Sequence, residues 1–300
     1  MRQLISRIVH KIGGTHRWRF DRKRINEASD HPDVFVQAVA CALLQRNEAF
    51  DWGKEERKAL LAIKALRSRL FNDTTAISQI DHGAGSAHEN RTREQMEKGV
   101  LNRSSVSSTA RSASSPKHWG ELMYALVREL QPEKCLELGT HLGISGSYQA
   151  SAMRLNGRGQ LITIEGAPEF AAMARDNMAS LGLTNFSVRC GRFKDVLPDI
   201  LREDGPFDLV FIDGHHDHDA TLDYFDMIHP FLTPRALVIF DDIRWSDGMQ
   251  RAWKRLMDDP RTGVTFDLGR WGLACIGTPQ TQQRPSFPLV KLARDRARTP

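Results

Sequence analysis

The sequence predicts an α/β protein with one mostly parallel sheet of seven strands, helices on both faces and an additional helical appendage at the N-terminal end. From residue 117 onward, apolar runs of strand length alternate with helical patterns, which produces a parallel sheet covered by helices. The last two apolar runs follow each other without a helix between them, which predicts an antiparallel hairpin. A chain of 300 residues with 40% hydrophobic content can bury one large core, alone or with a small helical domain.

The chain divides into four regions by composition. These are a basic segment at 1–30, a helical appendage with a lid or loop at 31–116, the core domain at 117–278 and a basic tail at 279–300. Within the appendage, helices are expected from Pro32 to Leu44 and from Lys54 to Phe71, where apolar residues recur at helical spacing. The Ser-rich stretch 103–115 is expected to be a loop or a mobile lid.

The core domain is expected to begin with an amphipathic helix at 119–130. Its strands are expected at 134–138, 160–164, 185–189, 207–212, 236–240, 264–268 and 272–277. Further helices are expected at 144–156 and from Gly248 to about Asp258. The first five strands alternate with helices and are therefore expected to be parallel.

A glycine turn joins the first strand of the core to the next helix. Gly139, Gly143 and Gly146 lie there within eight residues, so the backbone can adopt positive φ and approach a ligand closely. The start of the following helix adds free backbone N–H groups. The spacing G-x-x-x-G-x-x-G differs from the G-x-G-x-x-G of dinucleotide-binding folds.

Acidic residues at the ends of the first two strands narrow the choice of ligand. Glu137 lies two residues before the first glycine, where a carboxylate opposes a diphosphate and suits a cation. S-adenosylmethionine carries a sulfonium and an ammonium group and needs no phosphate site. Glu165 ends the second strand, at the position where a carboxylate holds a ribose diol. The glycines alone also fit an ordinary tight turn that binds no ligand. The two acids favour a turn that binds S-adenosylmethionine.

Four stretches together resemble the class I S-adenosylmethionine-dependent methyltransferases. They are ELGTHLGIS at 137–145, TIEG at 163–166, FDLVFIDGHH at 207–216 and VIFDDI at 238–243. The resemblance covers about Pro32 to Gly277 and is strongest to small-molecule O-methyltransferases of the catechol and antibiotic-sugar type, which implies a Rossmann-like sheet. Thr140-His141-Leu142 departs from the commoner G-x-G spacing of that family.

The resemblance assigns cofactor contacts to nine positions of this sequence. They are Glu137, Gly139, Thr140, Gly143, Ser145, Glu165, Gly191, Arg192 and Asp213. It implies that Glu165 holds the ribose, that Glu137 lies at the methionine end and that Gly191 and Arg192 contact the adenine. His141, within the glycine turn, is expected to face the cofactor or the surface rather than to act as a base.

The resemblance also implies a cluster of carboxylates at one edge of the sheet. In the family's strand order, the strands that end before Asp213 and before Asp241-Asp242 are neighbours, about 4.8 Å apart. Three unpaired carboxylates would repel one another, so a divalent cation, the sulfonium or Arg244 is expected among them. By position, Asp213, Asp241 and Asp242 correspond to the Mg²⁺ ligands of the related enzymes, and all are hard oxygen donors.

An alternative for these acids is a metal-free site. In that case Asp213 orients the acceptor, and the Asp241-Asp242 pair caps the following helix. In the antibiotic-sugar enzymes a histidine three residues after the first acid takes the acceptor's proton, and the resemblance places this base at His216. His215 or His218 replaces it if the register of the loop differs.

Two further features bear on the mouth of the expected site. The DHGAGS stretch at 81–86 resembles an element that folds over the cofactor in bacterial members of the family, and it equally fits a plain interdomain turn. Trp245 and Trp271 either wall the acceptor pocket or, for Trp271 at least equally well, pack in the core.

The charge distribution bears on possible partners, and the cysteine spacing bears on the cellular compartment. The formal net charge of +5 comes from the two ends: residues 1–30 hold eight Lys/Arg against three Asp/Glu, and residues 279–300 hold five against one. The core is net negative, so no nucleic acid partner is expected. The four cysteines form no C-x-x-C pair and no secretory or membrane-spanning segment is seen, so a soluble, cytoplasmic protein with reduced thiols is expected.

Together these observations predict S-adenosylmethionine-dependent O-methylation of a small-molecule hydroxyl, with or without help from Mg²⁺. A homo-oligomer remains open, and the sequence does not name the acceptor. Two rival hypotheses are an NAD-dependent oxidoreductase and a non-catalytic protein that binds a partner through its helical N-terminus. The missing G-x-G-x-x-G argues against the first, and the intact acids at the strand ends argue against the second.

Overall fold

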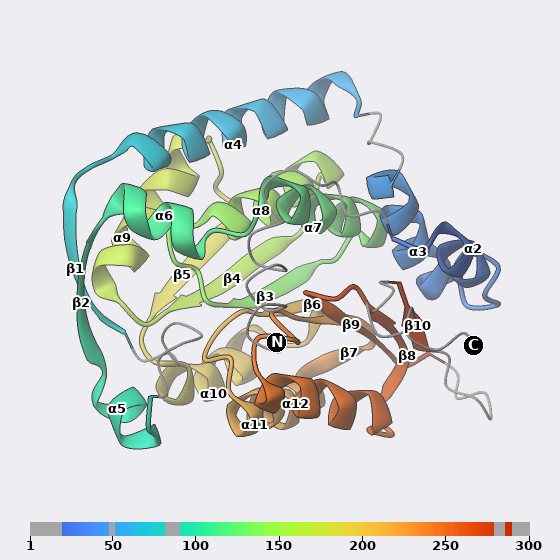
Figure 1. Ribbon diagram of the computed structural model, residues 1–300. Coiled ribbons are helices and arrows are strands. Elements are labelled where there is room, and N and C mark those ends of the chain that lie inside the picture. The colour runs from blue at the N-terminus through green and yellow to red at the C-terminus, as the bar shows by residue number, and fades with distance from the viewer. Residues whose placement is uncertain (1–19, 48–51, 82–90, 279–285, 290–300) are drawn as a thin grey trace, which may run out of the picture.

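An eight-stranded sheet lies at the centre of the protein in the computed structural model, which describes residues 20–47, 52–81, 91–278 and 286–289 (Figure 1). The strands of this sheet are β3 (Lys134–Leu138), β4 (Gln160–Glu165), β5 (Phe186–Cys190), β6 (Phe207–Ile212), β7 (Leu232–Phe240), β8 (Thr262–Asp267), β9 (Gly272–Ile276) and β10 (Ser286–Pro288). Their spatial order is β10-β8-β9-β7-β6-β3-β4-β5. A separate ladder pairs β1 (Ala76–Asp81) with β2 (Val100–Ser105).

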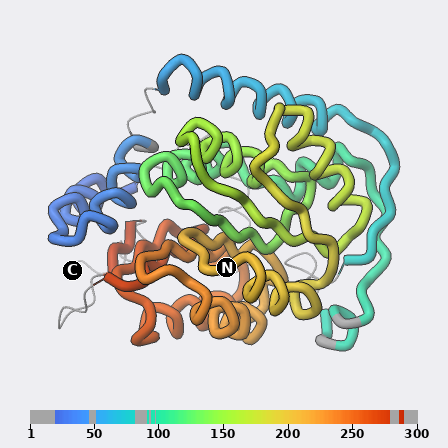
Figure 2. Tube along the Cα trace, turned by 180° about the vertical axis from the view of Figure 1, so that it is seen from behind, coloured from blue at the N-terminus to red at the C-terminus, as the bar shows by residue number. Residues whose placement is uncertain are grey.

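Helices cover both faces of the large sheet, as the alternating pattern predicts (Figures 1 and 2). One face is covered by α7 (Lys117–Leu130), α8 (Ile144–Asn156) and α9 (Pro168–Ser180), and the other by α10 (Phe193–Asp204), α11 (His218–Ile228) and α12 (Asp247–Asp258). The short helix η2 (His229–Phe231) follows α11. Successive residues of a strand point to opposite faces of the sheet and pack in two different apolar layers. Cys135 packs on the α7–α8 side, and Leu136 on the α10–α12 side.

The carboxyl ends of the central strands lie level with one another. Leu138 at the end of β3 pairs with Ile212 at the end of β6, and Ile212 pairs with Phe240 at the end of β7. β3, β4, β5, β6 and β7 are parallel, while β9 runs antiparallel between β7 and β8. The expected terminal hairpin is therefore confirmed, and the residues that follow β3, β6 and β7 emerge at one edge of the sheet.

The sheet has one strand more than the seven expected from the sequence. The additional strand, β10, lies in the segment expected to be a basic tail and pairs in parallel with β8. Phe287 stacks on Phe266 with ring centroids 5.2 Å apart, and this packing covers the outer edge of the sheet. A three-residue Ser-Phe-Pro strand is too short to produce a recognisable alternation, so no local pattern predicts it.

The Ser-rich stretch 103–115 is not the loop that its composition predicts. It contains the end of β2 and then helix α6 (Val106–Ala113). The Ser105 side chain caps this helix by accepting from the N–H of Ser108 at 3.1 Å. Val106 and Ala110 are fully buried on the face that packs against α4 (Lys54–Asn72). Burial of this apolar face outweighs the weak helix propensity of the serines.

The two expected N-terminal helices are present and pack on the α7–α8 side of the sheet. α3 (Val34–Asn47) packs on α7, and α4 lies along α8 (Figure 1). α2 (Arg22–Ser29) lies within the basic segment 1–30, and α5 (Arg93–Lys98) precedes β2. In the DHGAGS stretch, Asp81 ends β1 and the other residues lie outside the described residues.

Cys135 and Cys275 are buried thiols, as expected from their apolar surroundings in the sequence. None of the helices in the described part of the chain combines the length and the apolar character needed to cross a membrane.

Candidate functional site

The glycine turn after β3 is closely packed against the residue that follows β6. Gly139 has φ of 104°, and a Cβ at this position would lie 2.0 Å from the carbonyl oxygen of Asp213. The N–H groups of Gly139 and Thr140 both donate to the carbonyl of Ile164, at 3.0 and 3.1 Å. Glycine is required here because any side chain would separate the ends of β3 and β6.

The second glycine of the turn starts α8. Gly143 has φ of 77° and approaches Ala174 of α9, where an added Cβ would lie 3.2 Å from the backbone. Within α8, the N–H of Ser147 is the first that donates back to the residue before the helix, the carbonyl of Gly143. The earlier N–H groups of the helix, including that of Ser145, point towards the turn.

Glu165 follows β4 and braces the glycine turn through both oxygens of its carboxylate. One oxygen accepts from the N–H of His141 at 2.7 Å, and the other accepts from the N–H of Ala167 at 2.9 Å. Burial raises the pKa of Glu165, although these backbone donors oppose the shift. The carboxylate has further lone pairs for a ligand diol.

Glu137 lies beneath the turn rather than at its surface. Its side chain is fully buried and accepts hydrogen bonds from Gln149 Nε2 at 3.0 Å and Thr163 Oγ1 at 2.8 Å. Burial raises the pKa of Glu137 to about 7, against hydrogen bonds from Ser145, Thr163 and Gln149 that favour the charged form. Ser145 therefore connects this buried carboxylate with the cavity wall.

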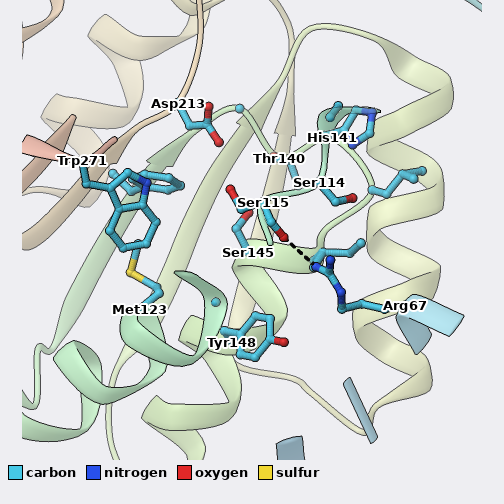
Figure 3. A pocket seen from close by; sticks show the side chains of 16 residues that line it. Arg67, Ser114, Ser115, Met123, Thr140, His141, Ser145, Tyr148, Asp213 and Trp271 are labelled. Atoms are coloured by element: carbon cyan, nitrogen blue, oxygen red, sulfur yellow. Dashed lines mark hydrogen bonds between the residues drawn. The ribbon is translucent and has the colours of Figure 1, made fainter. Parts of the chain in front are cut away.

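A cavity with about 480 Å³ of empty space, including the part open to solvent, lies beside the turn (Figure 3). Its lining comes from α4, the α6–α7 connection, α7, the glycine turn, α8, β6 and the β8–β9 turn. The lining includes Arg67, Ser115, Gly139, Thr140, His141, Ser145, Tyr148, Asp213 and Trp271. Asp213 and Trp271 lie on one side, and Arg67 and His141 on the other (Figure 3).

Two side chains of the cavity wall have environments that the sequence does not reveal. Arg67 Nη1 donates to the carbonyl of Ser115 at 2.9 Å, which ties α4 to the α6–α7 connection. Burial lowers the pKa of His141 to about 4, so its imidazole is neutral near pH 7. Trp271 is almost fully buried in the hydrophobic core and also lines the cavity, so both alternatives expected for it are met. Trp245 packs beside the His216 ring, with 5.7 Å between centroids.

The three expected carboxylates converge at the ends of β6 and β7. Asp241 is fully buried, and both its oxygens accept from Arg270, Nε to Oδ1 and Nη2 to Oδ2, each at 2.8 Å. Arg270 Nε also lies 3.4 Å from Asp242 Oδ1. Burial acts to raise the pKa of Asp241, but Arg270 outweighs it and holds that pKa at about 2. Burial and the charge of Asp241 raise the pKa of Asp213.

Arg270 is the residue that sequence reasoning missed. It lies in the β8–β9 turn, and the pairing of Phe240 with Gly272 brings this turn beside the end of β7. The expected candidate, Arg244, instead donates to both oxygens of Asp267, at 2.8 and 3.0 Å. The sequence did contain a signal for Arg270. It is a basic residue in the turn of a terminal hairpin, and that hairpin pairs with a strand that ends in acids.

Of the three candidate histidines, only His216 joins the acids. Its Nε2 lies 3.7 Å from Asp213 Oδ1 and 4.0 Å from Asp242 Oδ2. His215 turns to the other side, where its Nδ1 lies 2.6 Å from the hydroxyl of Tyr224. His218 begins α11 and pairs with Asp219 at 2.7 Å.

The expected adenine contacts lie after β5. Gly191 donates its N–H to the carbonyl of Glu165 at 2.9 Å, so this turn adjoins the expected ribose position. Arg192 is partly exposed and pairs with Asp195 of α10 at 2.5 Å. Neither residue lines the cavity described above.

The carboxylates at the ends of β6 and β7 meet the needs of Mg²⁺ only in part. The oxygens suit a hard cation, but both oxygens of Asp241 are already held by Arg270, and Asp242 adjoins the same guanidinium. The described residues contain no group of three or more His, Cys, Asp or Glu side chains arranged to hold a metal ion. The arrangement as it stands therefore does not fit a Mg²⁺ site.

Residues 136–243 match a family described as a methyltransferase domain. This part of the chain is therefore similar to methyltransferase domains. The chain is 36% identical over 126 residues to a catechol O-methyltransferase of Niastella koreensis, covering 41% of this chain and 55% of the relative. A catechol O-methyltransferase of Mycobacterium tuberculosis is 30% identical over 125 residues, covering 41% and 54%. The chain thus spans about half the length of the curated relatives that it matches.

A solved structure shares the fold of most of the chain. The cofactor-bound protein Rv0187 from MTB superimposes with a TM-score of 0.51 at 20% identity, covering 83% of this chain and all of that one. The overlap extends beyond residues 136–243, so elements outside the matched domain contribute to the shared fold.

Proposed function

We propose that the protein transfers a methyl group from S-adenosylmethionine to a hydroxyl of a small molecule. The observation that carries this proposal is the convergence of the glycine turn, Glu165 and Asp213 around one region, beside a cavity that Gly139, Thr140 and Asp213 line. The match of residues 136–243 to a methyltransferase domain supports the same activity, as do the catechol O-methyltransferases among the relatives.

In the proposed reaction, the acceptor oxygen attacks the methyl carbon in line with the carbon–sulfur bond. The bond between carbon and oxygen forms as the bond between carbon and sulfur breaks, and S-adenosylhomocysteine leaves with the electron pair. His216 takes the proton of the hydroxyl, and Asp213 orients the acceptor and keeps His216 in place. The separation of 3.7 Å between His216 Nε2 and Asp213 Oδ1 is consistent with this pairing.

The cofactor residues take complementary roles in this proposal. Glu165 holds the ribose diol, while Gly191 and Arg192 border the adenine. Gly139, Thr140 and Gly143 form the turn that faces the methionine part of the cofactor. Ser145 contacts the same part, and its side chain also hydrogen-bonds to the buried Glu137. Mg²⁺ takes no part in this proposed reaction, because Arg270 holds both oxygens of Asp241.

The test of the proposal is calorimetry with S-adenosylhomocysteine and, in parallel, with NAD, followed by methyl transfer from labelled S-adenosylmethionine to catechol as a probe acceptor. Binding of S-adenosylhomocysteine with no binding of NAD is the expected result. Binding of NAD alone would instead support an oxidoreductase, and binding of neither would support a non-catalytic protein.

Glu165→Gln is expected to weaken S-adenosylhomocysteine binding by about tenfold to a hundredfold. The amide can still accept, but it loses the charge that strengthens hydrogen bonds to the ribose hydroxyls, worth about 1.5–3 kcal/mol for a charged partner. Calorimetry measures the affinity. Glu169→Gln, an exposed acid in the first turn of α9, is the matched control and should leave it unchanged. Equal affinities for the two variants would remove Glu165 from the ribose site.

A further inference from the structure

The carboxylates at the ends of β6 and β7 already have a permanent counter-charge within the chain. Arg270 donates to Asp241 through two parallel hydrogen bonds of 2.8 Å, the geometry in which a planar guanidinium matches a carboxylate best. The same Nε lies 3.4 Å from Asp242 Oδ1. One side chain therefore contacts two of the three acids that the family resemblance assigns to a metal.

Backbone pairing within the sheet fixes the position of Arg270. Its own carbonyl accepts from the N–H of Ile243 at 3.0 Å, just after the two acids. Gly272 pairs with both Phe240 and Asp267, which fixes the β8–β9 turn beside the end of β7. The side chain of Asp241 is completely inaccessible, so its partner must remain in place.

This arrangement competes with a divalent cation for the same oxygens. Mg²⁺ requires nearly octahedral oxygen coordination at short distance and keeps several of its waters. Asp241 has both oxygens engaged and no exposed surface through which hydrated Mg²⁺ can reach it. Asp213 and Asp242 each retain some exposure, and both face His216 within 4.0 Å.

We propose that Arg270 takes the place of the divalent cation in this site, so that cofactor binding and methyl transfer do not require a metal. The inference rests on the proposed methyltransferase function and concerns the charge balance of that same site. Arg270 acts by positioning: its single positive charge pairs with Asp241 and partly offsets the charge of Asp242, and it leaves Asp213 and His216 to face the acceptor.

The first arm of the test uses the unaltered protein. Titration with MgCl₂ in the calorimeter should give no binding at millimolar concentration, and exhaustive chelation with EDTA should change neither the affinity for S-adenosylhomocysteine nor methyl transfer to catechol. Saturable one-to-one binding of Mg²⁺, or loss of transfer on chelation that Mg²⁺ restores, would overturn the proposal. This arm decides the matter even if the variants below do not fold.

The second arm uses Arg270→Met, which removes the charge and keeps much of the apolar stem. The three carboxylates are then uncompensated, so Mg²⁺ should bind to the variant at millimolar concentration, where the unaltered protein shows no binding, and should raise the variant's melting temperature. Arg244→Met is the matched control: its side chain is 30% exposed, against 29% for Arg270, and it also pairs with both oxygens of an aspartate. Mg²⁺ affinity gained by neither variant, or by both equally, would contradict the specific role of Arg270.

The outcomes separate this inference from the proposed function. Binding of S-adenosylhomocysteine together with Mg²⁺ binding to the unaltered protein would remove Arg270 from its assigned role and leave methyl transfer in place. Absence of S-adenosylhomocysteine binding would remove the methyltransferase function, and the MgCl₂ titrations would still report whether Arg270 excludes the cation.

Discussion

Gly139→Ala is expected to destabilise the protein by about 4 kcal/mol or more and to abolish S-adenosylhomocysteine binding. The new Cβ would lie 2.0 Å from the carbonyl oxygen of Asp213, a backbone atom that cannot rotate away. The residue also has φ of 104°, where a side chain adds strain. The ends of β3 and β6 would have to separate, and these two ends form the turn and the acidic edge of the site.

The matched control for this variant is Gly157→Ala at the end of α8. Gly157 also has a positive φ, 72°, but an added Cβ would meet nothing within 4 Å. It should therefore cost only about 1–2 kcal/mol for the left-handed conformation. Urea unfolding measures both losses, and calorimetry measures ligand binding. If the two alanines destabilise equally, the close approach between Gly139 and Asp213 does not exist in solution.

The second large effect is a dependence of stability on pH that comes from Glu137. Burial raises the pKa of this carboxyl from 4.5 to about 7 in the folded protein. Between these two values the folded state binds more protons than the unfolded state, so stability decreases as the pH rises from 4.5 to 7. The shift corresponds to about 3 kcal/mol of lost stability across that window.

Glu137→Gln isolates this contribution, because the amide fills the same space and does not titrate. Relative to the unaltered protein, the variant should gain about 3 kcal/mol as the pH rises from 4.5 to 7, measured by urea unfolding at a series of pH values. Glu133→Gln, one residue before β3 with a side chain that is 74% exposed, should show no such change. A difference between Glu137→Gln and the unaltered protein that stays constant with pH would contradict the buried, protonated carboxyl.

Much of the fold follows from local patterns in the sequence. The strands of the core appear within a few residues of their expected positions, since each is a short apolar run that ends at a glycine or an acid. The helices at α3, α4 and α7 likewise follow from apolar residues at helical spacing. By contrast, α6 and β10 were missed, because the first is stabilised by packing on α4 and the second by pairing with β8.

For the site, the sequence by itself determined which chemical groups stand at the ends of the strands. Acids follow β6 and β7 whatever the packing, since the apolar runs before them must be buried. Only the tertiary structure decided their partners: Glu137 is sealed beneath the turn, His216 rather than His215 faces Asp213, and Arg270 pairs with Asp241. The last of these contacts joins residues that lie 29 positions apart, and the register of the β8–β9 hairpin against β7 sets it. No local pattern contains that register.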